Sequence, residues 1–384
     1  MLFLPPLAMN ARMIEIFDGI YRQALGDFKA NRAHQAVEGF ARLRQLAPDY
    51  PGLDVAYAKA LRRDARFEDA LAAFDTLKGD AIELGFEKAM CLLALGCAPE
   101  ALAAFDWVLE RRPNMAVAWY HSHAPALALR GMEDALRRLE HAMACTGPVN
   151  GNYAALLAAY RWLQGEEGLA LSLARKGRHR VLIDGLKAIK PHLRQDHALF
   201  ALAPQLLAYA MSEARTDGLV LEFGVRRGTS LRHLAAIAGQ EVHGFDSFEG
   251  LPEAWGSAGP GLLSTASQLP TVPANARLHP GWFEDTLPAF LAEHPGNVRF
   301  VNIDSDLYAS ARTVLFALAP RLVEGSVVVF DELIGNPSWK EDEFKALAEF
   351  KTAFDVQYEY FALSPATKQA ALKILQAPRF AKSQ

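Results

Sequence analysis

Two short apolar runs near residue 300 constrain the fold of this chain more than any other feature. The first is Phe-Val-Asn-Ile followed by Asp304, and the second is Val-Val-Val-Phe followed by Asp331 and Glu332. Such runs are typical of buried strands, and residues 309–322 between them have the pattern of one helix. Consecutive parallel strands joined by a crossover helix are neighbours, and their carboxyl ends open into the ligand crevice of a doubly wound sheet. We therefore expect an α/β fold in which these carboxylates converge.

A third apolar segment, upstream of these two, ends in a glycine loop. Leu-Val-Leu-Glu222 is followed by Gly224 and Gly228, and a helical pattern begins directly after the second glycine. Glycines let the backbone pass close to a ligand. The next expected strand ends in Asp246, where an acid commonly binds the ribose hydroxyls of a nucleotide-like cofactor.

Two classes of cofactor fit a strand, loop and helix of this kind. A dinucleotide needs the spacing G-x-G-x-x-G, which lets its pyrophosphate bind the helix N-terminus. The spacing here is E-x-G-x-x-x-G, and Glu222 would place a negative charge beside a pyrophosphate. The same carboxylate is favourable beside the cationic amino group of a methionine moiety. The comparison favours S-adenosylmethionine, and a strand-to-helix turn without a ligand is the structural alternative.

The segment that follows, residues 247–280, is long and rich in Gly, Pro and Ser. Loops of this length in compact domains are usually functional or disordered. We interpret it as a lid over the cofactor, with a flexible insertion as the alternative. Trp282 comes next, and it either borders the adenine or packs in the core.

The converging acids also suggest a metal site. Carboxylates packed closely repel one another unless a cation or a proton is shared. An all-carboxylate set favours magnesium, or calcium, over zinc or copper. Such a metal would hold an acceptor hydroxyl and lower its pKa, and Asp306 or Asp304 would accept the proton. The alternative is that these acids are helix caps and turn formers.

The first 150 residues contain an internal repeat. The pattern Ala-x-x-x-Phe begins at Ala36, Ala70 and Ala101, and a weaker copy ending in leucine begins at Ala135, so that the starts are 34, 31 and 34 residues apart. In two copies a proline follows the phenylalanine by eight residues. This pattern resembles the tetratricopeptide repeat, a pair of antiparallel helices of about 34 residues. Repeats of this kind form a concave surface for a protein partner or another subunit.

We expect the chain to have three parts. They are tetratricopeptide-like helical repeats in residues 1–150, a helical bridge in residues 151–217 that packs on the next domain, and the α/β domain in residues 218–384. Helical periodicity at residues 152–164 and 199–215 supports the bridge. Two last strands, residues 358–363 and 370–375, are expected to form a hairpin that closes one edge of the sheet.

Composition limits the class of protein. The formal net charge of -4 argues against a general nucleic-acid-binding protein. No run approaches the roughly eighteen apolar residues of a membrane span. The three cysteines are isolated and lack zinc-type spacing, which fits a reducing compartment. The expectation is a soluble cytoplasmic protein with no nucleic-acid partner and no membrane span.

Six segments between residues 218 and 376 resemble the macrocin O-methyltransferase family: LEFGVRRGTS, FDSFEGLPEAW, GWFEDTLP, NIDSDLYASA, VVVFDE and FALSPATKQAAL. That family includes sugar O-methyltransferases of macrolide and aminocoumarin antibiotic pathways. The resemblance implies a class I methyltransferase fold with a seven-stranded sheet, which uses S-adenosylmethionine and Mg²⁺. It implies that Asp304, Asp331 and Glu332 bind the metal and that Asp304 or Asp306 is the general base. It also implies a cofactor site made of Glu222, Gly224, Gly228, Ser230, Asp246 and Ser247.

Two departures from the family pattern stand out. Glu332 occupies a position where many relatives carry a second aspartate, and the helical repeats are absent from the best-known antibiotic enzymes. We expect an S-adenosylmethionine- and Mg-dependent O-methyltransferase that acts on a hydroxyl, with a sugar or glycan as the candidate acceptor. The alternatives are an NAD-dependent oxidoreductase and a tetratricopeptide scaffold whose second half does not catalyse. The repeats would bind a partner, the acceptor or a second copy of the chain.

Overall fold

The computed structural model describes residues 11–78, 81–145, 151–175, 177–255 and 259–380. By its internal contacts the chain divides into two compact units, Met1–Cys91 and Leu92–Gln384. This division falls inside the region expected to contain the repeats. The three-part division at residues 150 and 217 therefore stays a prediction.

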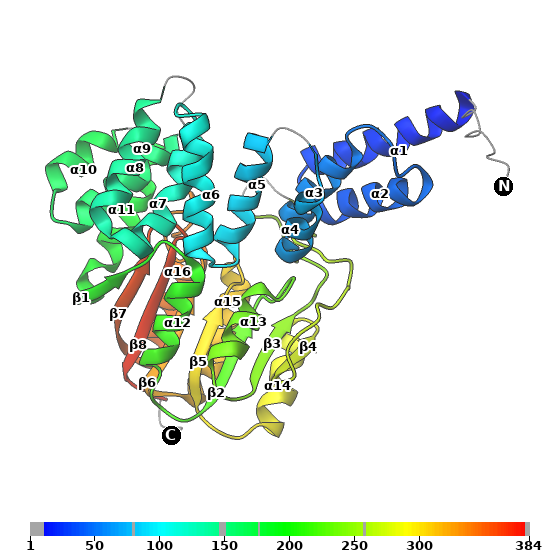
Figure 1. Ribbon diagram of the computed structural model, residues 1–384. Helices are drawn as coiled ribbons and strands as arrows, with labels where there is room; N and C mark the ends of the chain where they lie inside the picture. Colours follow the sequence, from blue (N-terminus) through cyan, green and yellow to red (C-terminus); the bar gives the residue numbers. More distant parts are fainter. Residues whose placement is uncertain (1–10, 79–80, 146–150, 176, 256–258, 381–384) are drawn as a thin grey trace. The chain divides into compact units, whose positions relative to one another are not determined.

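The smaller unit is built from antiparallel helix pairs (Figure 1). Its helices are α1 (Ala11–Lys29), α2 (Ala33–Leu46), α3 (Leu53–Arg63), α4 (Phe67–Asp75) and most of α5 (Ala81–Ala94). The repeat alanines and phenylalanines of α2 and α4 are completely buried: Ala36, Phe40, Ala70 and Phe74. A small residue followed one turn later by a large one on the same face lets two helices approach and fills the gap between them.

The larger unit begins with a second set of helices. They are α6 (Ala98–Arg111), α7 (Ala116–Arg130), α8 (Met132–Ala144), α9 (Gly151–Leu163), α10 (Glu167–Leu173) and α11 (Gly177–Ile189), followed by the 3₁₀ helix η1 (Lys190–His192). The remaining repeat positions are also completely buried: Ala101 and Phe105 on α6, and Ala135 and Leu139 on α8. All four sequence copies thus lie in equivalent helices, α2, α4, α6 and α8, and the predicted helical repeat is confirmed.

An eight-stranded sheet forms the rest of the larger unit. Its strands are β1 (Leu193–Leu199), β2 (Leu219–Phe223), β3 (Val242–Asp246), β4 (Ala276–Pro280), β5 (Val298–Ile303), β6 (Leu322–Phe330), β7 (Gln357–Ser364) and β8 (Gln369–Gln376). Their order is β1-β7-β8-β6-β5-β2-β3-β4, and β8 alone runs against its neighbours. From β2 the chain runs outward to β3 and β4, and it then returns to β5 on the other side of β2 and continues to β6. β2 and β5 therefore flank the topological switch point of the sheet.

The expected number of seven strands is wrong by one. The extra strand, β1, comes from the segment predicted to be a helical bridge, and it pairs in parallel with β7. The β7–β8 hairpin therefore does not close the edge, because β8 is inserted between β6 and β7 and β1 covers the outer side of β7. An added strand satisfies the backbone groups that β7 would otherwise leave open at the edge.

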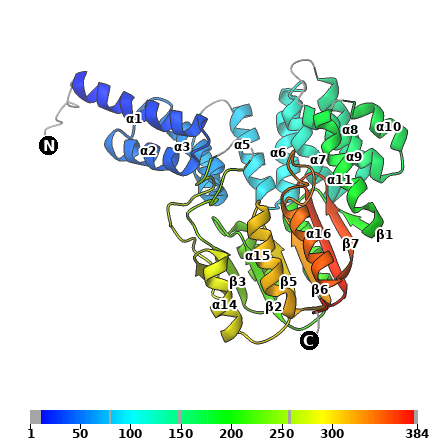
Figure 2. The ribbon, with the colours of Figure 1, turned by 180° about the vertical axis from the view of Figure 1, so that it is seen from behind.

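Helices cover both faces of the sheet (Figures 1 and 2). On one face lie α12 (Ala203–Glu213) and α13 (Thr229–Ile237), and on the other lie α14 (Phe283–Glu293), α15 (Tyr308–Leu318) and α16 (Glu343–Phe354). Alternate strand residues pack into the two cores, so Val327 and Val329 contact one helical layer while Val328 contacts the other. Burial on both faces explains why these strands read as continuous apolar runs.

The predicted pairing of the two acid-ended strands is confirmed. β5 and β6 are parallel neighbours joined through α15 and the short helix η2 (Ala319–Arg321), and Ile303 is aligned with Phe330. The amide of Asp331 donates to the carbonyl oxygen of Ile303 at 2.9 Å, and the amide of Asp304 donates to that of Phe223 on β2 at 2.8 Å. The ends of β2, β5 and β6 are thereby fixed side by side.

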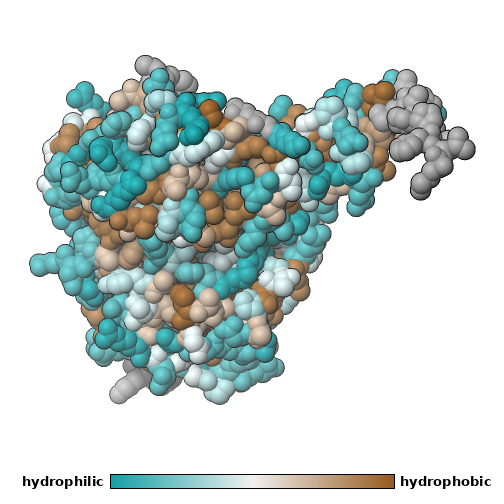
Figure 3. All heavy atoms as spheres, viewed as in Figure 1, coloured by the Kyte–Doolittle hydropathy of each residue, from teal (hydrophilic) through white to brown (hydrophobic). Residues whose placement is uncertain are grey.

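The surface of the face seen in Figure 1 is mixed, with teal polar side chains around smaller groups of brown apolar ones (Figure 3). Among the described residues, no helix combines the length and the apolar character that crossing a bilayer requires.

Candidate functional site

The glycine loop after β2 approaches the end of β5 very closely. Gly224 has φ +98°, and a Cβ atom on it would lie 1.8 Å from the carbonyl oxygen of Asp304. Gly228 has φ +73° and is the N-cap of α13. Both positions therefore require glycine, one for contact between neighbouring strand ends and the other for the turn into the helix.

Asp246 organises this loop from the end of β3. Its Oδ2 accepts hydrogen bonds from the amides of Val225 at 2.8 Å and Arg226 at 2.7 Å, and its Oδ1 accepts one from the amide of Phe248 at 2.7 Å. The carboxylate thus joins the glycine loop to the chain after β3, a role that the sequence reading did not foresee. The Asp246 carboxylate also lines the pocket described below, where it could accept further hydrogen bonds. Its binding of ribose stays a prediction.

Glu222 lies at the end of β2, completely buried. It accepts a hydrogen bond from Asn302 Nδ2 at 3.0 Å and another from the hydroxyl of Ser230, in the first turn of α13. Burial raises the pKa of Glu222 to about 8. Its Oε2 has no hydrogen-bond partner among the described residues, so the carboxyl group carries an unused acceptor just behind the glycine loop.

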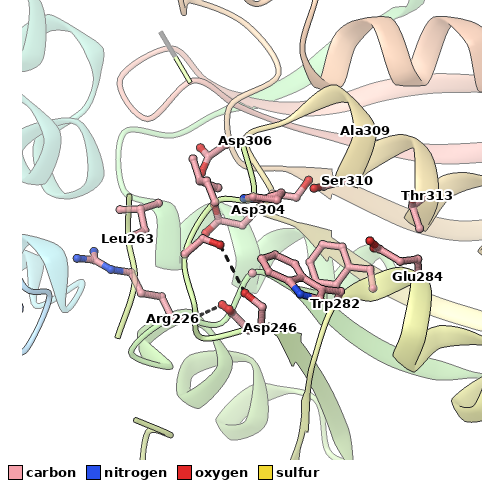
Figure 4. A pocket seen from close by; sticks show the side chains of 17 residues that line it. Arg226, Asp246, Leu263, Trp282, Glu284, Asp304, Asp306, Ala309, Ser310 and Thr313 are labelled. Carbon is pink, nitrogen blue, oxygen red and sulfur yellow. Dashed lines mark hydrogen bonds between the residues drawn. The ribbon is translucent and has the colours of Figure 1, made fainter. Parts of the chain in front are cut away.

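A pocket opens where these elements meet, and Figure 4 shows the side chains that line it, with Arg226 extending away from the others. It encloses about 200 Å³ and is open to solvent. Six of the residues predicted from the sequence line it: Gly224, Asp246, Ser247, Trp282, Asp304 and Asp306. Glu222, Gly228, Ser230, Asp331 and Glu332 lie around it and are not in its lining.

The chain after β3 forms one wall of this pocket. Gly250, Leu251 and Leu263 line it, and the segment is held together by backbone bonds between Leu251 and Leu262 and between Gly261 and Leu251, both 2.9 Å long. Phe248 anchors its start in the core. The last five residues of the predicted lid form strand β4 instead, and residues 256–258 lie outside the described residues.

Several lining residues were missed from the sequence. They are Arg226, Leu263, Phe283, Glu284, Ser310 and Thr313. Ser310 and Thr313 are three residues apart on α15, so they lie on the same face of the helix. Small polar residues at this spacing, directly after a strand that ends in an acid, could have predicted that they line the pocket. Leu263 reaches the pocket only through the fold of the long loop, which no local pattern reveals.

The acids after β5 influence one another strongly. Burial raises the pKa of Asp304 well above its usual range, and the charges of Asp331 and Asp306 raise it further. Burial and the charges of Glu332 and Asp331 raise the pKa of Asp306 to about 7. Asp306 also has φ +61°, which directs the chain away from β5 at the pocket. These carboxyls would therefore gain from a nearby cation.

The acids after β6 have partners on the β7–β8 turn. Asp331 Oδ1 accepts a hydrogen bond from Gln369 Nε2 at 2.5 Å, and burial with the Glu332 charge raises the pKa of Asp331 to about 6. Glu332 is bound on both oxygens, to Lys368 Nζ at 3.1 Å and to Asn336 Nδ2 at 2.5 Å. Lys368 and Gln369 lie more than thirty residues downstream of the acids that they bind, so no local pattern predicts these two partners.

The arrangement fits a hard cation only in part. Across the part of the chain that the structure describes, no three His, Cys, Asp or Glu side chains are grouped as a metal site. Asp304, Asp306 and Asp331 nevertheless offer oxygen ligands whose repulsion a cation would relieve. Glu332 is already neutralised by Lys368. Metal binding, with Asp304, Asp331 and Glu332 as ligands, stays a prediction.

Comparisons with known proteins agree with this geometry. Residues 221–333 match the family described as "Methyltransferase domain". The chain is 31% identical over 156 residues to the 8-demethyl-8-(2,3-dimethoxy-alpha-L-rhamnosyl)-tetracenomycin-C 4'-O-methyltransferase of Streptomyces olivaceus, covering 33% of this chain and 58% of that protein. It is 31% identical over 87 residues to the demethyldecarbamoylnovobiocin O-methyltransferase of Streptomyces niveus, covering 23% of this chain and 30% of that protein. The chain thus spans little more than half of the first relative and a third of the second.

Among solved structures, the calicheamicin methyltransferase CalS11 is similar at 23% identity, covering 60% of this chain and 95% of that protein with a TM-score of 0.37. A tetratricopeptide protein of Thermus thermophilus is similar at 16% identity, covering 45% and 96%, also with a TM-score of 0.37. Both likenesses are remote.

Proposed function

We propose that this protein is an S-adenosylmethionine-dependent O-methyltransferase that acts on a hydroxyl of a sugar-containing small molecule with the help of Mg²⁺. The observation that carries the proposal is one pocket whose lining includes Gly224 and Asp246 together with Asp304 and Asp306. A loop suited to a nucleoside and a cluster of proton-accepting carboxyls share this space. The matched methyltransferase family covers the same residues.

The cofactor half of the pocket suits S-adenosylmethionine. Gly224 lines the pocket, with Gly228 at the end of the same loop, and Asp246 and Ser247 offer polar groups to the ribose hydroxyls. Trp282, at the start of α14, offers an aromatic surface for the adenine. The unused Oε2 of Glu222 suits a cationic amino group, which would favour the ionised carboxylate. When bound, the cofactor supplies a methyl group on a positively charged sulfur.

The acid half of the pocket suits proton removal from the acceptor. Asp306 has a pKa of about 7, and a general base is most effective when its pKa lies near the working pH. Asp304 lies next to it in the lining and is the other candidate base. Asp304 and Asp331, with Glu332 as a weaker candidate, would hold Mg²⁺, which supplies a Lewis acid for the acceptor oxygen.

The sugar acceptor is supported by the relatives. The name of the first relative includes a rhamnosyl group, and the name of the second gives demethyldecarbamoylnovobiocin as its substrate. An NAD-dependent oxidoreductase is less consistent with the site, because the glycine loop lacks the G-x-G-x-x-G spacing that lets a pyrophosphate bind the helix N-terminus. The helical repeats offer a surface for a protein partner or for a second copy of the chain.

The full chain incubated with S-adenosylmethionine labelled in its methyl group tests the proposal. The assay uses a set of neutral glycosides and a metabolite extract as acceptors, with Mg²⁺ or with EDTA. We expect a labelled product whose formation falls when EDTA is added. No labelled product from any acceptor, with cofactor bound, would support the non-catalytic scaffold instead.

A further inference from the structure

A second cavity lies in the larger unit, next to the acids after β6. It encloses about 500 Å³ and is open to solvent. One part of its lining comes from the loop after β6 and the β7–β8 turn: Gly335, Asn336, Pro337, Pro365, Ala366 and Lys368. The other part comes from the helices α7, α9 and α11, including Tyr120, Asn152, Ala155 and His179.

Glu332 links the second cavity to the acids that line the first pocket. Asn336 and Lys368, which line the second cavity, bind the two oxygens of Glu332 at 2.5 and 3.1 Å. Asp306, which lines the first pocket, is close enough to Glu332 for that charge to raise its pKa. A molecule in the second cavity would therefore contact Asn336 and Lys368, the two side chains that bind Glu332.

The helices are packed tightly against this end of the sheet. A Cβ atom on Gly185 of α11 would lie 2.8 Å from Cβ of Ile334, directly after the β6 acids. A Cβ atom on Gly151 at the start of α9 would lie 2.3 Å from Nε2 of His179. The wall formed by α9 and α11 is thus a fixed part of the cavity.

We propose that this second cavity binds the acceptor as a neutral, hydroxyl-rich ring such as a glycoside, with α7, α9 and α11 forming its outer wall. The inference rests on the proposed function, because methyl transfer requires the donor and the acceptor oxygen to meet in line from two sides. In this proposal α7, α9 and α11 form part of the substrate site as well as part of the helical region that contains the repeats.

The lining matches a neutral ring better than an anion. The Tyr120 ring, stacked on Tyr153 with centroids 4.6 Å apart, offers an aromatic surface. Asn152 and Asn336 place side-chain amides around it, although the Asn336 amide also binds Glu332 and Lys368, and Ala155 and Leu156 place apolar surface. A few polar groups set among apolar and aromatic ones are typical of sites for small neutral ligands. The ammonium of Lys368 is already paired with Glu332, so it would have to leave that carboxylate to bind a phosphate.

Saturation-transfer NMR on the full chain loaded with S-adenosylhomocysteine tests this site. The probes are p-nitrophenyl α-L-rhamnopyranoside, which is neutral, and glucose 1-phosphate, which is anionic. Ala155→Phe fills the cavity, and Asn152→Ala changes a lining residue that is exposed on α9 and leaves the fold intact. Ala292→Phe, on the exposed end of α14, is the matched control for adding a phenyl group.

We expect the rhamnoside to bind the wild type and Ala292→Phe equally. Its signal should be at least about fivefold weaker in Ala155→Phe and reduced in Asn152→Ala, because the ring loses its space or a polar contact. Binding of S-adenosylhomocysteine, measured by calorimetry, should be the same in all four proteins.

Two results would overturn the inference while leaving the proposed function standing. One is normal binding of S-adenosylhomocysteine with no rhamnoside signal, or with a signal unchanged in both cavity variants. The other is stronger binding of glucose 1-phosphate than of the rhamnoside. Absence of S-adenosylhomocysteine binding in the wild type would instead reject the proposed function, and this inference with it.

Discussion

Glu343 Oε1 lies 3.3 Å from the backbone nitrogen of Ser305 and 3.4 Å from its hydroxyl. Ser305 stands between Asp304 and Asp306, so this buried carboxyl at the start of α16 fixes the segment that carries both candidate bases. Burial raises the pKa of Glu343 well above its usual range, and the Asp306 charge raises it further. Glu343 is a positioning residue for the acid cluster.

Two replacements of Glu343 therefore separate its role in positioning Ser305 from the effect of its negative charge. Glu343→Gln keeps an acceptor for the Ser305 amide, and we expect it to retain most of the methyl-transfer rate. Glu343→Ala removes the acceptor, and we expect kcat to fall by at least about tenfold because the reacting groups move. S-adenosylhomocysteine affinity should stay within a factor of two or so of the wild type. Equal methyl-transfer rates for Glu343→Gln and Glu343→Ala would show that Glu343 does not position the acids.

Gly224 should tolerate no side chain. In Gly224→Ala the new methyl group would meet the Asp304 carbonyl, and we expect a loss of more than about 3 kcal/mol in the free energy of unfolding. Gly239→Ala is the control, because Gly239 has φ +68° and open space around it. That variant should lose about 1 to 2 kcal/mol, from backbone strain alone. Urea unfolding measures both, and similar losses would show that the contact with Asp304 is not tight.

Glu222 should make the stability of the sheet depend on pH. Its pKa is raised from 4.5 in the unfolded chain to about 8 in the folded one, so between these values the unfolded state releases a proton that the folded state keeps. Stability should therefore fall as pH rises through this window, by about 1.4 kcal/mol per pH unit from this group. Below pH 4.5 and above pH 8 the group should contribute no further change.

Glu222→Gln tests this directly, since glutamine cannot ionise. The loss of stability between pH 5.5 and pH 8, measured by urea unfolding without cofactor, should be smaller in the variant by about 3 kcal/mol. Parallel pH curves for the two proteins would contradict the assigned pKa.

The two acids after β6 should differ in their importance for Mg²⁺. Asp331 faces the other carboxyls, while Glu332 is held by Lys368 and Asn336. We expect Asp331→Asn to weaken Mg²⁺ binding by at least about tenfold, and Glu332→Gln to weaken it less. Calorimetric titration with MgCl₂ compares them. A larger loss in Glu332→Gln would show that the metal displaces Lys368 and takes Glu332 as a ligand.

Much of this architecture follows from local pattern. Continuous apolar runs ending in Asp304 and Asp331 indicated neighbouring parallel strands, because strands buried on both faces need apolar residues throughout. The spacing of Ala36, Ala70, Ala101 and Ala135 indicated the helical repeats for a similar reason, since each copy must fill the same gap. Six residues predicted for the cofactor or the acid site meet in one pocket because strand ends and loops meet at the switch point of the sheet.

What the sequence could not show depends on contacts between distant segments. Strand β1 has the polar sequence Leu-Arg-Gln-Asp-His-Ala-Leu, and only the open edge of β7 makes it a strand. Lys368 and Gln369 reach the acids after β6 from a turn that follows two further elements. The second cavity needs α7, α9 and α11 beside that turn, which no motif in the helices signals.

The central claim is that the pocket between the glycine loop and the β5 acids binds S-adenosylmethionine, and isothermal titration calorimetry of the full chain tests it most directly. We expect saturable binding of S-adenosylmethionine and S-adenosylhomocysteine at one site, and no heat of binding with NAD. Binding of NAD in place of S-adenosylmethionine, or no heat from either cofactor with and without Mg²⁺, would contradict it.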